Sequence, residues 1–167
     1  MKIRCVLAFM LIVLAGCASG VAKEDHGGVD LEQEERLAGS MTELLHWALD
    51  YYGENLEPFE REVFERAIKT GRIDTADYEA GHSEYVQCLS RHGFHPEFRK
   101  TPEGIYIELP YEPGDHDRFD AAGIKCSMGF NHVQIMYRRQ QVNPSLLADE
   151  RLVAIQCLRR LGYIDSG

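Results

Sequence analysis

Apolar residues recur at three- and four-residue steps along much of this chain, and most of the runs stop at a glycine. This spacing places the apolar side chains on one face of an α-helix, whereas a half-buried strand needs them at every second position. Glycine readily adopts the left-handed conformation in which many helices end. We therefore predict amphipathic helices that begin near Glu32, Pro58, Asp74 or Thr75, Asp115 and Pro144, the last capped by Asn143. The predicted ends are Gly53, Gly71, Gly93 and Gly162.

One segment alternates instead of following the helical period. Apolar residues stand at positions 94, 96 and 98 and again at 105, 107 and 109, and the turn-forming segment 100–104 separates them. This pattern predicts a β-hairpin. The segment Val133–Tyr137 is ambiguous and could extend the helix that begins at Asp115. The predicted fold class is α+β, with several amphipathic helices packed on one β-hairpin, and a mostly α fold is the alternative.

The N-terminus has the pattern of a secretory signal. Lys2 and Arg4 precede an apolar run, Val6–Leu14, that is shorter than the about 20 residues a spanning helix needs. The run leads into Leu14-Ala15-Gly16-Cys17, which resembles the lipobox of bacterial lipoproteins. The resemblance implies cleavage before Cys17 and a diacylglycerol on its sulfur. It also implies a protein held at the cell membrane by that lipid and facing outside the cytoplasm.

We divide the chain into a lipoprotein signal peptide at 1–16, a flexible tether at 17–30 and a single globular domain at 31–167. The formal net charge is −9, and signal cleavage would remove two of the positive charges. Acidity argues against a sequence-independent nucleic-acid partner, which requires basic surface. An acidic domain is also repelled by an anionic membrane, so we expect it to be held off the lipid on its tether.

Three cysteines fall in the predicted domain, namely Cys88, Cys126 and Cys157. Export favours disulfides, and one disulfide among three cysteines leaves one thiol. We favour Cys88 with Cys126, because this pair would join the helices that flank the hairpin. Cys88 with Cys157 remains open, because segments 85–94 and 154–163 share Gln, Cys, Leu, Arg and Gly in register. The remaining thiol is a buried apolar residue, a reactive group or part of an intermolecular bridge.

The order of motifs in the domain supports a second resemblance. A helix with Tyr85-x-x-Cys88-Leu89 is followed by Gly93-Phe94, an extended segment, a second cysteine and a final Cys-Leu-x-x-x-Gly unit. Over roughly residues 60–164 this arrangement resembles small uncharacterised lipoproteins of actinobacteria. The resemblance implies an exported one-domain protein on the outer face of the cytoplasmic membrane. It implies no particular activity.

Two groups of residues could bind metal ions. His92, His95 and His116 could hold zinc, but their spacing matches no known zinc motif, and we predict no resident metal or cofactor. The segment 70–77 resembles the second half of an EF-hand calcium loop. Arg66 stands where that loop needs its first oxygen ligand and would repel calcium. We therefore interpret the segment as a connection between two helices, with Ile73 packing in front of the cap.

Familiar catalytic motifs are missing from the sequence, which contains no Gly-x-Ser-x-Gly, phosphate loop or dinucleotide fingerprint. We interpret Glu60, Glu62 and Glu65 as a solvated helix face. We expect a non-catalytic binding or structural module at the membrane, with an envelope protein as a further partner. The alternative is a cell-envelope hydrolase or thiol enzyme that uses the spare cysteine or His92, His95 and His116. A third hypothesis is an inhibitor-like or immunity-like lipoprotein with a basic partner, suited to the acidic surface.

Overall fold

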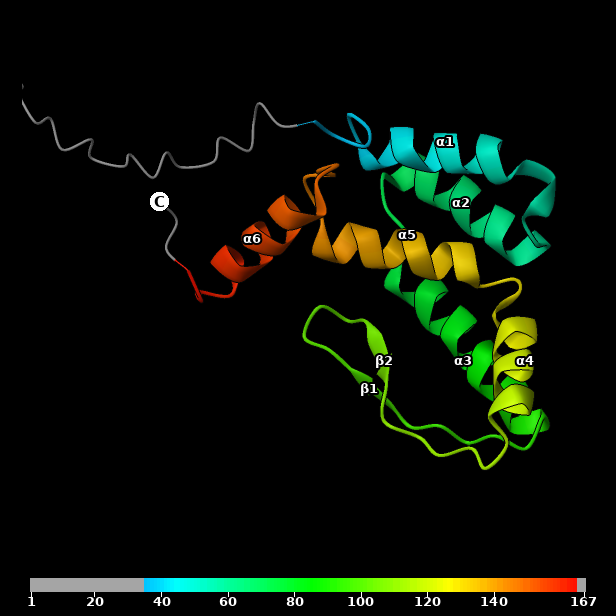
Figure 1. Ribbon diagram of the computed structural model, residues 1–167. Helices are drawn as coiled ribbons and strands as arrows, with labels where there is room; N and C mark the ends of the chain where they lie inside the picture. Colours follow the sequence, from blue (N-terminus) through cyan, green and yellow to red (C-terminus); the bar gives the residue numbers. More distant parts are fainter. Residues whose placement is uncertain (1–34, 165–167) are drawn as a thin grey trace, which may run out of the picture.

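A computed structural model describes residues 35–164 (Figure 1). The predicted signal peptide, Cys17 and the tether lie outside the described residues. The elements in chain order are α1 (Met41–Tyr52), the short 3₁₀ helix η1 (Gly53–Asn55), α2 (Pro58–Thr70), α3 (Thr75–Arg91), β1 (Phe98–Lys100), β2 (Tyr106–Glu108), α4 (His116–Ser127), α5 (Asn131–Val142) and α6 (Glu150–Arg160). This is the predicted α+β fold, with helices dominating.

The main core lies among α1, α2, α3 and α5, and Ile105 of the hairpin loop closes one side of it. Its largest fully buried side chains include Phe64, Tyr78 and Tyr137. A smaller cluster fills the space between α3 and α4 and consists of Leu89, Phe94, Ala122 and Cys126. In Figure 1, α4 lies beside the far end of α3, so the second cluster extends the fold away from α1 and α2.

Local capping signals account for most of the helix boundaries. Pro58 opens α2, where its missing N–H costs nothing, and Gly71 ends the helix with φ +78°. The Asp74 carboxylate accepts the Ala76 N–H at 2.8 Å and caps α3. After α3, Gly93 is left-handed and the Phe94 N–H donates to the Leu89 carbonyl at 3.0 Å. These predicted boundaries are confirmed.

The predicted hairpin is also confirmed. Its two strands pair antiparallel, with Arg99 opposite Ile107. The turn closes through the Thr101 N–H, which donates to the Ile105 carbonyl at 2.8 Å. The Tyr106 N–H donates to the hydroxyl oxygen of Tyr78 at 3.0 Å, so the hairpin is fastened to α3.

The first helix begins later than predicted. Its N-cap is Ser40, whose hydroxyl accepts the Glu43 N–H at 3.1 Å, and the Glu43 carboxylate accepts the Gly39 N–H at 2.9 Å. This reciprocal capping starts the helix at Met41. Arg36 instead forms an isolated antiparallel bridge with Leu147. The predicted acidic start before Glu35 lies outside the described residues.

The prediction that Asn143-Pro144 opens the last helix is wrong. Asn143 follows α5, and its buried side-chain amide both donates to the Leu147 carbonyl and accepts the Leu147 N–H, each at 2.9 Å. These bonds close a turn rather than cap a helix. The last helix begins at Glu150, after the capping carboxylate of Asp149. The ambiguous segment 133–137 belongs to a separate helix, α5, because the left-handed Gly129 turns the chain after α4.

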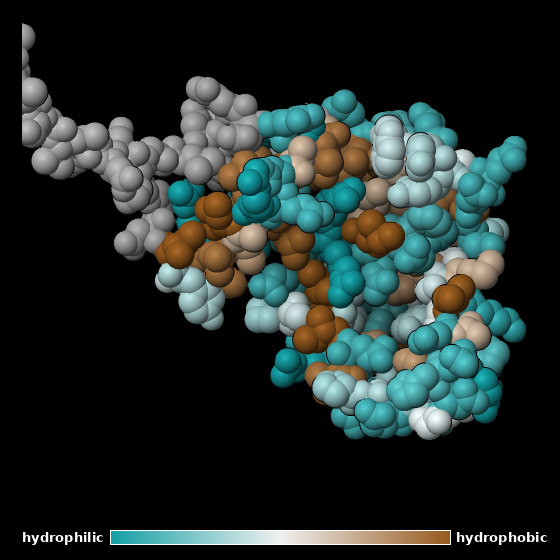
Figure 2. Space-filling view, in the orientation of Figure 1, coloured by the Kyte–Doolittle hydropathy of each residue, from teal (hydrophilic) through white to brown (hydrophobic). Residues whose placement is uncertain are grey.

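Helix α6 extends away from the rest of the fold and has no fully buried residue (Figure 1). Apolar side chains gather over this helix in the space-filling view (Figure 2). Its end repeats the end of α3, because Gly162 is left-handed and the Tyr163 N–H donates to the Leu158 carbonyl at 2.9 Å. The repeated residues in the two segments therefore specify the same helix end, although the two helices pack differently.

Candidate functional site

A disulfide joins α3 to α4. Cys88 and Cys126 are bonded, with 5.5 Å between their Cα atoms, and Cys157 is a half-buried free thiol. The favoured pairing is therefore present, and the alternative with Cys157 is not. Closing a loop of 38 residues stabilises the fold by about 4 kcal/mol, chiefly by restricting the unfolded chain.

A groove of about 640 Å³ lies over this disulfide. Pockets of this size are typical of small-molecule binding sites. The apolar part of the lining comes from three elements and the turn between α4 and α5, and its largest members are Phe59, Tyr85, Met128 and Phe130. Both disulfide cysteines line the groove, so the bond fixes the distance between its α3 and α4 walls.

A buried glycine shapes the groove wall. A Cβ on Gly81 would lie 2.2 Å from the Phe130 ring, far inside contact distance. Glycine therefore lets this ring lie directly against the α3 backbone. Phe130 is itself 4% exposed, so its ring is held on the other sides by the core.

Charged residues lie at the rim. Arg91 on α3 and Lys125 on α4 are exposed cations, and neither forms an ion pair with any residue in the range 35–164. Glu84 adds one carboxylate. An apolar floor with two unpaired cations suits a ligand that has an apolar body and an anionic group.

The three histidines considered for zinc are not brought together. Within residues 35–164, the one group of three or more potential ligands whose atoms all lie within 4.8 Å of one another is Cys88, His92 and Cys126. Both sulfurs are in the disulfide, and a disulfide sulfur is not the thiolate that binds zinc. His95 contacts the Ser90 hydroxyl at 3.2 Å, and His116 lies 3.9 Å from Glu112.

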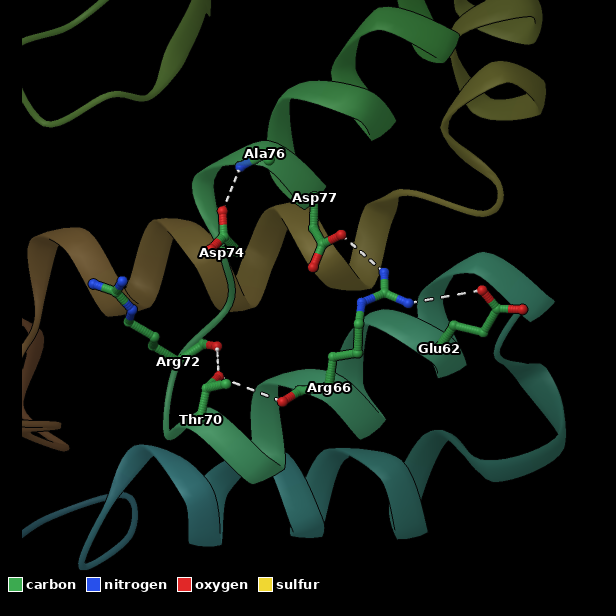
Figure 3. Close-up of polar contacts among 7 residues, drawn as sticks. All are labelled: Glu62, Arg66, Thr70, Arg72, Asp74, Ala76 and Asp77. Atoms are coloured by element: carbon green, nitrogen blue, oxygen red, sulfur yellow. Dashed lines mark hydrogen bonds and ion pairs between the residues drawn. The ribbon is translucent and has the colours of Figure 1, made fainter.

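The Arg66 side chain lies against the segment 70–77 that resembles half of a calcium loop. Arg66 donates to Asp77 at 2.8 Å and lies 3.8 Å from Glu62 (Figure 3). Asp74 is engaged in capping α3, as the dashed line to Ala76 in Figure 3 shows. The guanidinium thus takes the place a cation would take, and its pKa is raised by the hydrogen bond to Asp77. This agrees with the interpretation of the segment as a connection between helices.

A buried carboxylate was missed by the sequence reasoning. Glu60 is 1% exposed, which contradicts its assignment to a solvated face, whereas Glu62 and Glu65 are exposed as predicted. The Glu60 carboxylate accepts the backbone N–H of His132 at 2.8 Å and lies 3.1 Å from His132 Nδ1. It also accepts the Glu57 N–H at 3.3 Å. One carboxylate therefore serves the N-termini of α2 and α5, where backbone dipoles favour negative charge.

A second histidine is enclosed between the hairpin and α3. The His82 ring stacks on Tyr106 with 3.9 Å between ring centres and meets Phe98 edge-on. His82 Nδ1 is buried and has no hydrogen-bond partner among residues 35–164. Burial lowers the pKa of this imidazole, so the neutral ring is favoured.

Comparison with protein-family models, curated proteins and solved structures finds no match to this chain. Within residues 35–164, no helix combines the length and apolar character needed to cross a bilayer.

Proposed function

We propose that this protein is a lipid-anchored, extracytoplasmic binding protein whose groove takes a small ligand with an apolar body and an anionic group. The observation that supports binding is the groove of about 640 Å³, whose lining is largely apolar and includes Arg91 and Lys125, two cations without an ion pair among residues 35–164. The disulfide holds two of its walls at a fixed separation, and such preorganisation reduces the entropy lost on binding. The proposal includes no catalytic step.

The lipobox supports the location of the proposed protein. Leu14-Ala15-Gly16-Cys17 has the aliphatic, small, small, cysteine order of that signal. A diacylglycerol on Cys17 supplies two acyl chains, which hold a protein at a membrane far more firmly than one. Purification from the native membrane, followed by alkylation without reduction, tests this. We expect an intact mass of residues 17–167 plus lipid and one alkyl group, and a mass without lipid would refute the anchor.

Ligand binding is tested with a matched pair of probes. Dodecanoate has an apolar chain and a carboxylate, and dodecanol has the same chain without the charge. We expect saturable one-to-one calorimetric binding of dodecanoate below its micelle concentration, and weaker binding of dodecanol. Arg91→Ala and Lys125→Ala should each weaken dodecanoate binding about fivefold to tenfold, whereas Arg99→Ala on β1 should not. Equal binding of the two probes would refute the role of the cations.

The alternative of a cell-envelope hydrolase draws support from a pair of residues other than those predicted. The buried Glu60 carboxylate orients His132, as the acidic member of a catalytic triad orients its histidine. A cavity of about 240 Å³ beside this pair also contacts Ser127. Turnover of p-nitrophenyl acetate that is lost in both His132→Gln and Ser127→Ala would support a hydrolase. The absence of turnover above buffer would leave the binding protein as the better account.

A further inference from the structure

The outer part of α6 and its surroundings expose an apolar surface, here called the α6 face. Leu161 and Tyr163 follow the last residue of α6, and they are 51% and 75% exposed. Exposed apolar residues also occur on α5 and among the first described residues. The exposed members of the α6 face are Leu37, Ile135, Leu158, Leu161, Tyr163 and Ile164. A groove of about 490 Å³ between α5 and the base of α6 adds Val142 and Val153. Exposed apolar side chains gathered on one element are typical of a protein or membrane contact.

Positive charge gathers on the same two helices. Segment 131–164 carries five arginines against the two carboxylates Asp149 and Glu150, although the chain as a whole has a formal charge of −9. Arg151 pairs with Asp149, which lowers the pKa of that carboxyl to about 2. Arg138, Arg139, Arg159 and Arg160 form no ion pair with any residue in the described part of the chain. The negative charge therefore belongs to the other elements.

The first described residues, 35–37, also enter the domain beside the start of α6. The Leu37 N–H donates to the Leu146 carbonyl at 2.7 Å, and the Ala148 N–H donates to the Glu35 carbonyl at 2.9 Å. These bonds fix the first described residues, drawn in blue in Figure 1, against the loop that leads into α6. A chain of the length between Cys17 and Glu35 spans at most about 60 Å even when fully extended. A lipid on Cys17 would thus hold the α6 face close to the bilayer.

We infer that the α6 face docks on a bilayer of anionic phospholipid. Leu158, Leu161 and Tyr163 enter the boundary between headgroups and acyl chains, while the unpaired arginines contact phosphates. This inference differs from the expectation that the whole acidic domain is held off the lipid. The difference arises because the acidic residues lie mainly outside α5 and α6. The inference uses the proposed lipid anchor only to bring the face to the membrane.

The test uses a chain that begins at Ala18 and so lacks the lipid. All buried apolar residues that form the core lie between Leu44 and Leu147, so this chain retains the core. It is mixed with sedimentable vesicles of phosphatidylglycerol and phosphatidylcholine, or of phosphatidylcholine alone. We expect binding to the anionic vesicles at low salt and at least tenfold weaker binding to the neutral ones.

Paired variants separate the α6 face from the rest of the surface. Arg159→Glu with Arg160→Glu should weaken vesicle binding at least 30-fold, and Leu161→Ser should weaken it about tenfold. The controls are Arg72→Glu with Arg99→Glu, which makes the same charge change elsewhere, and Ile124→Ser at another exposed apolar residue on α4. We expect the controls to bind like the unmodified chain, and circular dichroism melting verifies that every variant is folded.

Three results would overturn the docking. One is equal binding to neutral and anionic vesicles, and another is unchanged binding of the α6 variants. The third is a dimer in sedimentation velocity that Leu161→Ser dissociates, without vesicle binding, because a second copy would then cover the face. A native protein whose mass lacks lipid would refute the proposed anchor alone, and vesicle binding by the unlipidated chain would still support docking.

Discussion

The contact between Gly81 and Phe130 allows a stability prediction with a matched control. In Gly81→Ala the new methyl would lie 2.2 Å and 2.6 Å from two ring carbons of Phe130, which is too close for any pair of carbon atoms. The ring is 4% exposed and has little room to withdraw. Overpacking of this kind costs about 1–3 kcal/mol. Replacing glycine by alanine inside a helix offsets about 1 kcal/mol of that cost.

Gly123 on α4 is the control for this substitution. A Cβ at Gly123 would meet only the Tyr85 hydroxyl, at 3.9 Å, which is ordinary contact. Gly123→Ala therefore keeps the gain in helix propensity without the clash and should stabilise the fold by about 0.5–1 kcal/mol. Gly81→Ala should destabilise it by up to about 2 kcal/mol, because the offset of about 1 kcal/mol is subtracted from the overpacking cost of about 1–3 kcal/mol.

Urea unfolding of the oxidised proteins, followed by circular dichroism, measures both changes as free energies of unfolding. The two alanine variants should differ by about 2 kcal/mol and in opposite directions from the unmodified chain. Gly81→Ala should also weaken dodecanoate binding, because Phe130 lines the groove. A Gly81→Ala protein as stable as Gly123→Ala would refute the close approach of the Phe130 ring to α3.

Three further predictions concern the disulfide and two buried ionisable residues. Replacing both Cys88 and Cys126 by serine should lower the free energy of unfolding by about 4 kcal/mol in urea titrations, whereas Cys157→Ser should change it by less than about 1 kcal/mol. Glu60→Ala should cost about 2–4 kcal/mol in the same assay, because it leaves buried N–H groups of α2 and α5 without an acceptor. Burial lowers the pKa of His82, so the stability that the neutral ring contributes is complete above the unfolded pKa of about 6.5. That stability is lost as the pH falls below this value, by up to about 1.4 kcal/mol per pH unit. His82→Phe should remove this part of the pH dependence in unfolding titrations between pH 7 and pH 5.

The controls for these predictions are other residues of the same kinds. Glu62→Ala removes an exposed carboxylate from the same helix and should change stability by less than about 0.5 kcal/mol. His95→Phe replaces an exposed histidine and should leave the pH dependence unchanged. If Glu60→Ala matched Glu62→Ala, the carboxylate would not serve two helix ends. A pH dependence that persists in His82→Phe would assign the loss of stability to other groups.

Features that depend on residues close in the chain could be predicted from the sequence. The ends of α2 and α3 follow from Pro58, Gly71, Asp74 and Gly93, because caps involve partners within a few positions. The hairpin is equally local. The last helix was misplaced because the Asn143 side chain, which can cap a helix, instead bonds Leu147 across a turn.

The site itself depends on contacts between distant parts of the chain. Glu60 resembles its exposed neighbours in the sequence, and only His132, 72 positions later, explains its burial. The one local signal was its place three residues after Glu57, which fits a capping box. The groove likewise joins Phe59, Gly81 and Phe130 from separate elements, and no short motif encodes that arrangement.

The pairing of residues 35–37 with 146–148 has a mechanical consequence for a tethered protein. Tension applied at the N-terminus would reach the domain at Glu35, where the Ala148 N–H and the Leu37 N–H supply two backbone hydrogen bonds. Two backbone hydrogen bonds break at a lower force than a packed core, so this short pairing would separate first. Release of this pairing would lengthen the connection to the domain up to Ser40, the N-cap of α1, and reduce the tension on the core. In the proposed lipid-anchored protein, such tension would thus extend residues 35–39 while α1 to α5 kept their packing.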